Sequence, residues 1–221
     1  MSASETAEAH LDLVGGRLCL DFINTADSHA SDHPEEHLTS YAELVAWSQR
    51  TNILSEEEGQ LLLAEAAQRP IDALAILQEA GVFREVLFRI FLAALAGKTP
   101  GTDDLVIFNN TRAQALSRSE IAPTASGFAW HWKVSKQTLG WMLWPVALSA
   151  AELLLSPDLK QVRECSSPDC GWLFLDTSKN HTRRWCTMES CGNRDKARRH
   201  YQRKRQSVQT QARKPQVSDY S

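Results

Sequence analysis

Four cysteines near the C-terminal end of the chain have the residue type and spacing of a metal site. They are Cys165, Cys170, Cys186 and Cys191, in the pattern C-x4-C-x15-C-x4-C. Zinc favours tetrahedral thiolate coordination, and four cysteines close its shell without leaving a position for water or substrate. We therefore predict one structural zinc ion, whose binding replaces the hydrophobic core that a segment of about 40 residues cannot build. The alternative is four free thiols.

The residues around these cysteines predict the elements that hold them. Turn formers fill the gap at 166–169, and residues 187–190 must close the second gap in the same way. Residues 172–175 have the pattern of a strand, and residues 176–178 that of a turn. Beyond Gly192 the sequence to Arg205 contains no Pro or Gly and is typical of a helix. The order of knuckle, hairpin, ligand and helix predicts a treble-clef-like four-cysteine zinc finger.

Basic residues surround the second cysteine pair and continue along the predicted helix. The candidate nucleic-acid contacts are Arg183, Arg184, Asn193, Arg194, Lys196, Arg198, Arg199, Arg203, Lys204 and Arg205. Arginine and lysine side chains bind phosphates, and a face of a helix can present several of them together. One predicted face carries Arg194, Arg198 and Arg205, and another carries Lys196, Arg199 and Arg203. We expect Asn193 to cap the helix, with a contact to adenine in a groove as the alternative. Asp195 and Arg199 are expected to form an ordinary surface ion pair.

The net charge of −3 conceals two parts of opposite sign. Residues 1–160 hold 11 Lys/Arg and 21 Asp/Glu, a balance of −10, and residues 161–221 hold 13 and 6, a balance of +7. Such asymmetry favours binding of a polyanion by the basic part, although a solvated charged tail is the alternative. The fifth cysteine, Cys19, lies in an apolar run, and we expect a buried small side chain there rather than a redox thiol.

The larger N-terminal part has the pattern of a mainly α-helical domain with a small β-hairpin. Leu18 to Ile23 is apolar and fits a strand or a helix, and residues 26–39 read as a polar loop. Ser40 and Ser55 each precede a Glu by three residues, which predicts two capping boxes. Pro70 begins a long helix to about residue 95, with Leu74, Leu77, Val82, Leu87 and Phe91 as core candidates. Asp103 or Asp104 is expected to cap the next helix.

Alternating residues at 128–133 predict one strand of a hairpin, with a turn at Ser126 and Gly127. A last helix is expected over about 136–155, divided or kinked by Pro145, with a boundary near 156–158. The tryptophans Trp130, Trp132, Trp141 and Trp144 are interpreted as core rather than as a ligand cage. Residues 1–158 are expected to fold by themselves.

Several classes of function find no support in the sequence. His29, His33 and His37 recur every four residues, but Pro34 interrupts them, so they are interpreted as surface histidines rather than a second metal site. No phosphate loop, nucleophile elbow or acid–base pair is recognisable, and an enzyme is not expected. Without a signal-peptide pattern or an apolar run of about 20 residues, no membrane association is expected. We expect a cytoplasmic protein, and association with the nucleoid stays open.

Two parts of the chain resemble known families. Residues 165–205 resemble the CGNR zinc finger, which is named for the tetrapeptide found here at 191–194, and the flanks GWLFLD (171–176) and RRWC (183–186) also match. The preceding part resembles the ABATE domain in LDFINT (20–25) and in Trp144-Pro145. This resemblance implies a bacterial transcriptional regulator linked to stress. It also implies zinc ligation by the four cysteines and nucleic-acid contact by the basic helix.

The resulting prediction is a zinc-dependent DNA-binding regulator with a sensing or assembly domain. Its segments are a disordered terminus (1–10), an ABATE-like helical domain (11–158), a CGNR-type finger with the basic helix (159–206) and a disordered tail (207–221). An RNA-binding or ribosome-associated protein is one alternative, since Trp185 and Tyr201 could stack on bases. A zinc-thiolate redox switch is another. The effector, the target sequence and a homo-oligomeric state stay open.

Overall fold

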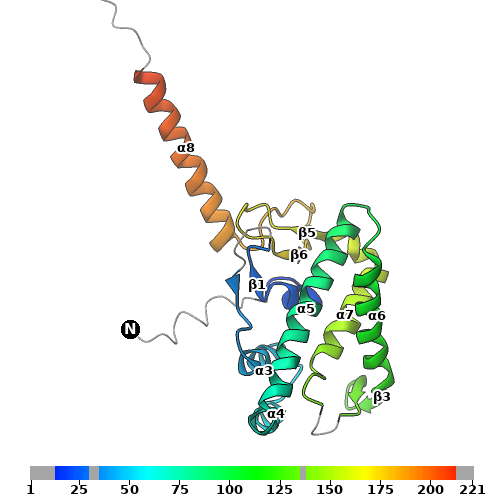
Figure 1. Ribbon diagram of the computed structural model, residues 1–221. Coiled ribbons are helices and arrows are strands. Elements are labelled where there is room, and N and C mark those ends of the chain that lie inside the picture. The colour runs from blue at the N-terminus through cyan, green and yellow to red at the C-terminus, as the bar shows by residue number, and fades with distance from the viewer. Residues whose placement is uncertain (1–12, 30–34, 135–137, 213–221) are drawn as a thin grey trace, which may run out of the picture.

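The computed structural model describes residues 13–29, 35–134 and 138–212, and for residues 206–212 it describes the backbone alone. Within these ranges the protein is mainly helical with short antiparallel strand pairs, as predicted (Figure 1). The predicted disordered segment 1–10 lies outside the described residues. Among those described, no helix combines the length and apolar character needed to cross a bilayer.

The first described elements are a short helix and a pair of two-residue strands. The apolar segment that fitted either a strand or a helix in the sequence is a helix, α2 (Leu18–Ile23). Four of its side chains are buried. The region predicted as a polar loop contains β1 (Ala26–Asp27) and β2 (Glu35–Glu36), which pair antiparallel. That prediction was incomplete because two-residue strands carry too little pattern to be recognised.

Two serine caps start the following helices. Ser40 Oγ accepts the Glu43 N–H at the start of α3 (Tyr41–Arg50), but the Glu43 carboxylate accepts from Thr39 rather than from Ser40. The full capping box forms at α4 (Glu56–Gln68), where Ser55 and Glu58 exchange both bonds. One predicted box is therefore complete and the other is half formed.

The long helix α5 (Pro70–Leu95) begins at the predicted proline and crosses the core. Leu87 and Phe91 are buried as predicted, whereas Leu74 and Val82 are each 55% exposed. Helix α6 (Thr102–Ser117) follows, with Gly101 at its N-cap and no side-chain cap bond. The predicted aspartate cap is wrong because the Asp104 carboxylate turns to Arg89, 2.6 Å away.

The predicted hairpin is formed by β3 (Ser119–Thr124) and β4 (Gly127–Trp132). Helix α7 (Leu143–Leu155) starts later than expected, so that Pro145 lies in its first turn, where it needs no N–H partner and causes no break. Figure 1 shows α5, α6 and α7 side by side. The 3-10 helix η2 (Pro157–Gln161) then leads into the cysteine-rich part.

The cysteine-rich part begins with a second hairpin, β5 (Val162–Glu164) and β6 (Leu173–Leu175). The π-helical turn η3 (Met188–Gly192) precedes α8 (Asn193–Ala212), which projects away from the body in Figure 1. Helix α8 runs to Ala212 and so enters the segment 207–221 that was predicted to be disordered. Val162, Leu173 and Leu175 belong to the main hydrophobic core, which therefore extends across the predicted boundary near 158.

Candidate metal centre

The four cysteine sulfurs converge at one point. All lie within 4.8 Å of one another, with 3.7 Å between Cys170 Sγ and Cys186 Sγ and 3.5 Å between Cys186 Sγ and Cys191 Sγ. Four sulfurs at about 2.3 Å from a tetrahedral zinc ion stand about 3.8 Å apart, so the spacing fits one ion. All four side chains are buried, and none forms a disulfide.

The thiol pKa values of three of these cysteines are shifted because the sulfurs lie so close together. Hydrogen bonds from the thiols of Cys170 and Cys186 lower the pKa of Cys165 to about 2. In turn, the Cys165 side chain is the largest cause that raises the pKa of both Cys170 and Cys186. The close sulfurs thus favour ionisation of Cys165 and oppose that of Cys170 and Cys186, and a bound cation would offset the charge. Zinc, when bound, supplies that charge and joins the two cysteine pairs.

Local hydrogen bonds bring the first cysteine pair together. Cys165 follows β5, and its N–H donates to Trp172 O at 2.8 Å, which extends the β5–β6 pairing. Cys170 N–H donates to Ser167 O at 3.1 Å and closes the turn. The first pair therefore lies in the turn of the β5–β6 hairpin. The sequence prediction had instead placed the hairpin after this pair, because β5 is too short to be recognised.

The second pair is held by a short helical turn. Thr187 Oγ1 accepts the Ser190 N–H and caps η3, which places Cys191 one turn after Cys186. The Cys186 N–H points to Cys165 Sγ at 3.4 Å and links the two pairs directly. Helix α8 starts directly after these residues, so zinc binding holds its first turn.

Asp176 and Arg183 organise the connection between the pairs. Asp176 is fully buried; its Oδ1 accepts from the Ser178 N–H and hydroxyl, and its Oδ2 accepts from the Arg183 N–H. The Arg183 guanidinium lies 4.3 Å above the Phe174 ring and donates to the carbonyls of Trp185 and Cys186. Arg183 is half-buried and has a structural role here, and its contact with nucleic acid stays a prediction. The turn at 176–178 was recognised from sequence, but its contact with Arg183 was not.

The finger docks on the start of the chain. Ser28 N–H donates to Cys170 O, and Ser28 Oγ donates to Asp169 O, each at 2.8 Å. The Trp172 indole N–H donates to Ala26 O at 3.0 Å. Because β1 and the residue that follows it supply these partners, the larger N-terminal part supports the zinc-binding loop.

The first turn of α8 is anchored to the metal centre. The Arg194 guanidinium lies 3.3 Å from Cys191 Sγ and 3.2 Å from Ser190 Oγ. Arg198 pairs with Asp169 at 2.9 Å, in the first cysteine loop. Asn193 is already helical and donates to Glu189 O, so it does not cap the helix as predicted.

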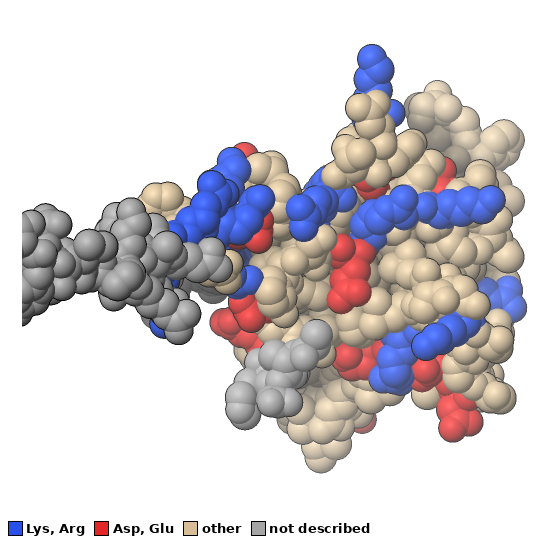
Figure 2. All heavy atoms as spheres, turned by 90° about the horizontal axis from the view of Figure 1, so that it is seen from above, with Lys and Arg blue, Asp and Glu red and all other residues tan. Residues whose placement is uncertain are grey.

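The remaining basic candidates face solvent. Arg199 pairs with Asp195 at 2.6 Å, as expected, and the Arg184 guanidinium lies 5.1 Å from the centre of the Trp185 ring. The other exposed basic side chains are Lys196, Arg203, Lys204 and Arg205. Figure 2 shows Lys and Arg side chains gathered where α8 leaves the body.

The histidines that the structure describes do not gather into a second metal site. The His29 ring is buried, stacks on Phe88 at 4.2 Å between centroids, and lies 3.4 Å from Glu85 Oε2. His37 lies 3.3 Å from Asp27, whose hydrogen bond raises the pKa of His37. The interpretation of His29 as a surface residue is therefore wrong, and His33 lies outside the described residues. Among the residues described, only the four cysteines cluster as metal ligands.

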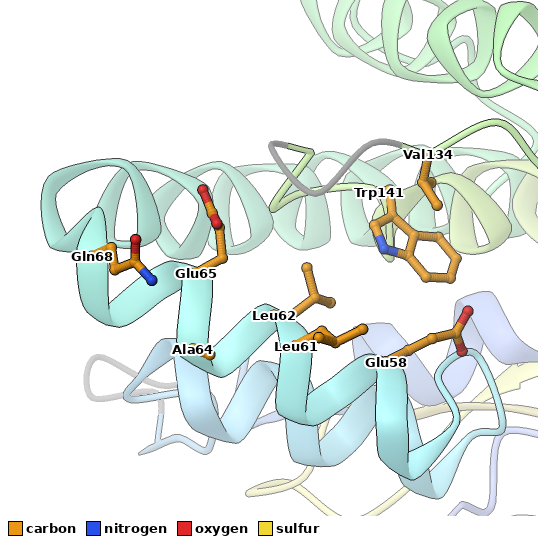
Figure 3. Close-up of a pocket in the computed structure, with 8 residues that line it drawn as sticks. All are labelled: Glu58, Leu61, Leu62, Ala64, Glu65, Gln68, Val134 and Trp141. Carbon is orange, nitrogen blue, oxygen red and sulfur yellow. The ribbon is translucent and has the colours of Figure 1, made fainter.

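The larger part also carries a hollow of about 340 Å³ beside α4. Leu62 on α4 points towards Trp141, with Val134 beside it (Figure 3). The two carboxylates that line this hollow have other partners, because Glu58 caps α4 and Glu65 pairs with Arg69. The hollow therefore offers apolar surface without a spare charge.

Comparison with known families accounts for both parts of the chain. The model described as "CGNR zinc finger" matches residues 161–204. The ABATE model, described as "Putative stress-induced transcription regulator", matches residues 16–157, more than half of the chain. The chain belongs to the ABATE family.

In this ABATE protein the two matches follow the predicted order, and all four clustered cysteines lie inside the CGNR match. The clustered thiols of a CGNR finger fit one structural zinc ion. Comparison with curated proteins finds no match.

Proposed function

We propose that this ABATE protein is a zinc-dependent DNA-binding regulator of transcription rather than an enzyme, and that α8 is the element that meets the nucleic acid. The observation that carries the proposal is an exposed basic helix whose first turn is tied to the zinc thiolates. Its 20 residues span about 30 Å at 1.5 Å per residue. Helix α8 projects from the body (Figure 1), and the basic side chains of Lys196 and Arg203 are exposed.

The basic residues of α8 include some that contact the finger and others whose side chains are exposed. Arg194 and Arg198 contact the finger, on the face that also carries Arg205. The face with Lys196 and Arg203 lies on another side of the helix and points into solvent. Guanidinium and ammonium groups at these positions suit contacts with phosphates, with Arg184 as an additional exposed cation.

Duplex DNA is the favoured polyanion because its major groove, about 12 Å wide, admits an α-helix. Zinc contributes by holding the direction of α8 relative to the body, since Cys191 lies two residues before the start of the helix. The acidic balance of residues 1–160 opposes phosphate contact by the larger part, which suits sensing or assembly. An intracellular protein associated with the nucleoid is consistent with this role.

The test measures the affinity of the zinc-loaded full-length protein for duplex DNA as a function of salt. Each Lys or Arg contact with phosphate is expected to add about −0.9 to the slope of log K against log salt. The double variant K196A/R203A should weaken binding to all sequences and flatten the slope by about two contacts. The double variant K98A/R118A removes the same charge from exposed positions on the larger part and should leave the slope unchanged.

An equal loss of affinity in both double variants would show general charge attraction and contradict a role for α8. A structured RNA is measured in parallel under the same conditions. If it binds more tightly than duplex DNA throughout the salt series, the RNA-binding alternative replaces the proposal.

A further inference from the structure

A second hollow, of about 310 Å³, lies where four elements of the larger part meet. Helix α2, the α3–α4 loop, β4 and α7 each supply part of its wall. Its lining includes Leu18, Asn52, Trp130, Trp132, Leu148 and Glu152. We call it the tryptophan groove, and we propose that it binds a small organic cation of the substituted-ammonium type.

The aromatic wall supplies the first argument. Trp130 and Trp132 are two positions apart along β4, so both side chains lie on the same face of the hairpin. Trp132 is held from behind by Trp141 and Trp144, at 6.5 and 5.9 Å between ring centroids. Trp130 has no such support and is 45% exposed, against the expectation that it would be core. Indole rings attract cations through their electron-rich faces more strongly than other aromatic side chains do.

Glu152 supplies the second argument. It lies on α7, is exposed, and lines the same groove as the two tryptophans. Within the described part of the chain, no hydrogen bond or ion pair engages its carboxylate, and no Lys or Arg is among the residues that line the groove. The groove therefore combines aromatic surface with a negative charge that no cation of the described chain neutralises.

The hollow beside α4 differs from the tryptophan groove in the state of its carboxylates. It too contains a tryptophan and two carboxylates, but Glu58 is bound in the helix cap and Glu65 is paired with Arg69. Only the tryptophan groove, among these two, retains a carboxylate for a ligand. Its volume is at the lower end of the roughly 300–1,000 Å³ of ligand cavities, which favours a small ion over a peptide.

The test uses choline as the cation and 3,3-dimethylbutan-1-ol as its uncharged counterpart of the same shape. Both are titrated into the zinc-loaded full-length protein while the indole N–H signals are followed by NMR. Choline should shift the signals of Trp130 and Trp132 in a saturable way, while those of Trp172 and Trp185 in the finger stay in place. The neutral alcohol should bind at least about fivefold more weakly, the effect of losing one cation–π contact.

Two variants assign the charge and the ring. Glu152→Gln should weaken choline binding about fivefold or more, whereas Glu79→Gln, the same change at an exposed position on α5, should not. Trp130→Ala should abolish the saturable shift at Trp132, and Trp130→Phe should restore part of it. Both sites are exposed, so folding is preserved, and circular dichroism checks this. Equal binding of choline and the alcohol, or equal effects of the two Glu variants, would overturn the proposal. The inference does not depend on DNA binding.

Discussion

The Asn24 side chain forms two hydrogen bonds with the main chain of Leu173. Its Nδ2 donates to Leu173 O, and its Oδ1 accepts the Leu173 N–H, each at 2.9 Å. Asn24 is the C-cap of α2, whereas Leu173 begins β6, so the side-chain amide acts as a one-residue strand partner across the boundary near 158. Both residues are buried, and each bond satisfies a group that would otherwise be unpaired.

We expect Asn24→Ala to destabilise the protein by about 2 kcal/mol or more, because it leaves both the Leu173 N–H and its carbonyl unsatisfied in the interior. Asn24→Asp keeps an acceptor but loses the donor, and should also destabilise. Urea denaturation measures the effect. Asn110→Ala, at an exposed position of α6, is the matched control. A midpoint for Asn24→Ala equal to that of the control would contradict a structural role for the pair.

The shared core also changes the expectation for a fragment that ends at residue 158. Val162, Leu173 and Leu175 are buried in the main core, and removing them exposes apolar surface of α2 that β6 covers in the full chain. We expect the fragment to keep helical content but to melt below the full-length protein, since lost burial costs about 25 cal/mol per Å². Thermal denaturation followed by circular dichroism tests this. Equal melting temperatures would support an independent N-terminal domain.

Zinc should be present at one equivalent per chain, as measured by elemental analysis of the purified protein. Cys186→Ser should lower zinc content and loosen the start of α8, because Cys186 contacts the other thiols at the centre of the cluster. Cys19→Ala is the control: burial raises the pKa of Cys19 to about 12, and that thiol lies outside the cluster. Full zinc occupancy in Cys186→Ser would contradict four-cysteine ligation.

Arg183 and Arg184 are adjacent in sequence but should behave oppositely. Arg183→Ala removes the bonds to two carbonyls and the contact with Phe174, so it should cost about 2 kcal/mol in stability. Arg184→Ala should leave stability nearly unchanged and reduce only affinity for nucleic acid, since its side chain is exposed. Denaturation and DNA titration of the same two variants separate the roles. A stable Arg183→Ala protein would exclude the structural role.

Asp21 predicts a measurable dependence of stability on pH. Burial raises the pKa of Asp21 from 3.8 to about 6, although a hydrogen bond from the Gly15 N–H opposes the shift. Because the folded state holds this proton more tightly, its contribution is fully present below about pH 4 and is lost as pH rises through 6. Asp21→Asn retains an acceptor for Gly15 and should be more stable at pH 7, by about 1–3 kcal/mol. Urea denaturation at pH 4 and pH 7 should show a smaller difference for the variant. An unchanged difference would mean that Asp21 ionises normally in the fold.

Local spacing was sufficient for the features that depend on neighbours in the chain. The four zinc ligands, the Ser55–Glu58 box, the start of α5 at Pro70 and the β3–β4 hairpin follow from residue types a few positions apart. A turn, a cap or a cysteine pair is specified by that short range, because its geometry involves only a few backbone angles. The basic character of α8 was equally visible, since exposed charge needs no partner to be predicted.

Long-range packing decided which side chains those elements bury, and the sequence alone did not determine that choice. His29 is buried against Phe88 and Arg183 turns into the finger, while Trp130 and Val82 face solvent. The Asn24–Leu173 pair and the groove around Glu152 each join segments that are distant in the chain. The side chain of an apolar or basic residue can be buried or exposed in several ways that its local sequence allows equally. Competition among distant elements for buried area and hydrogen-bond partners selects one of these positions. That competition exists only in the assembled tertiary structure.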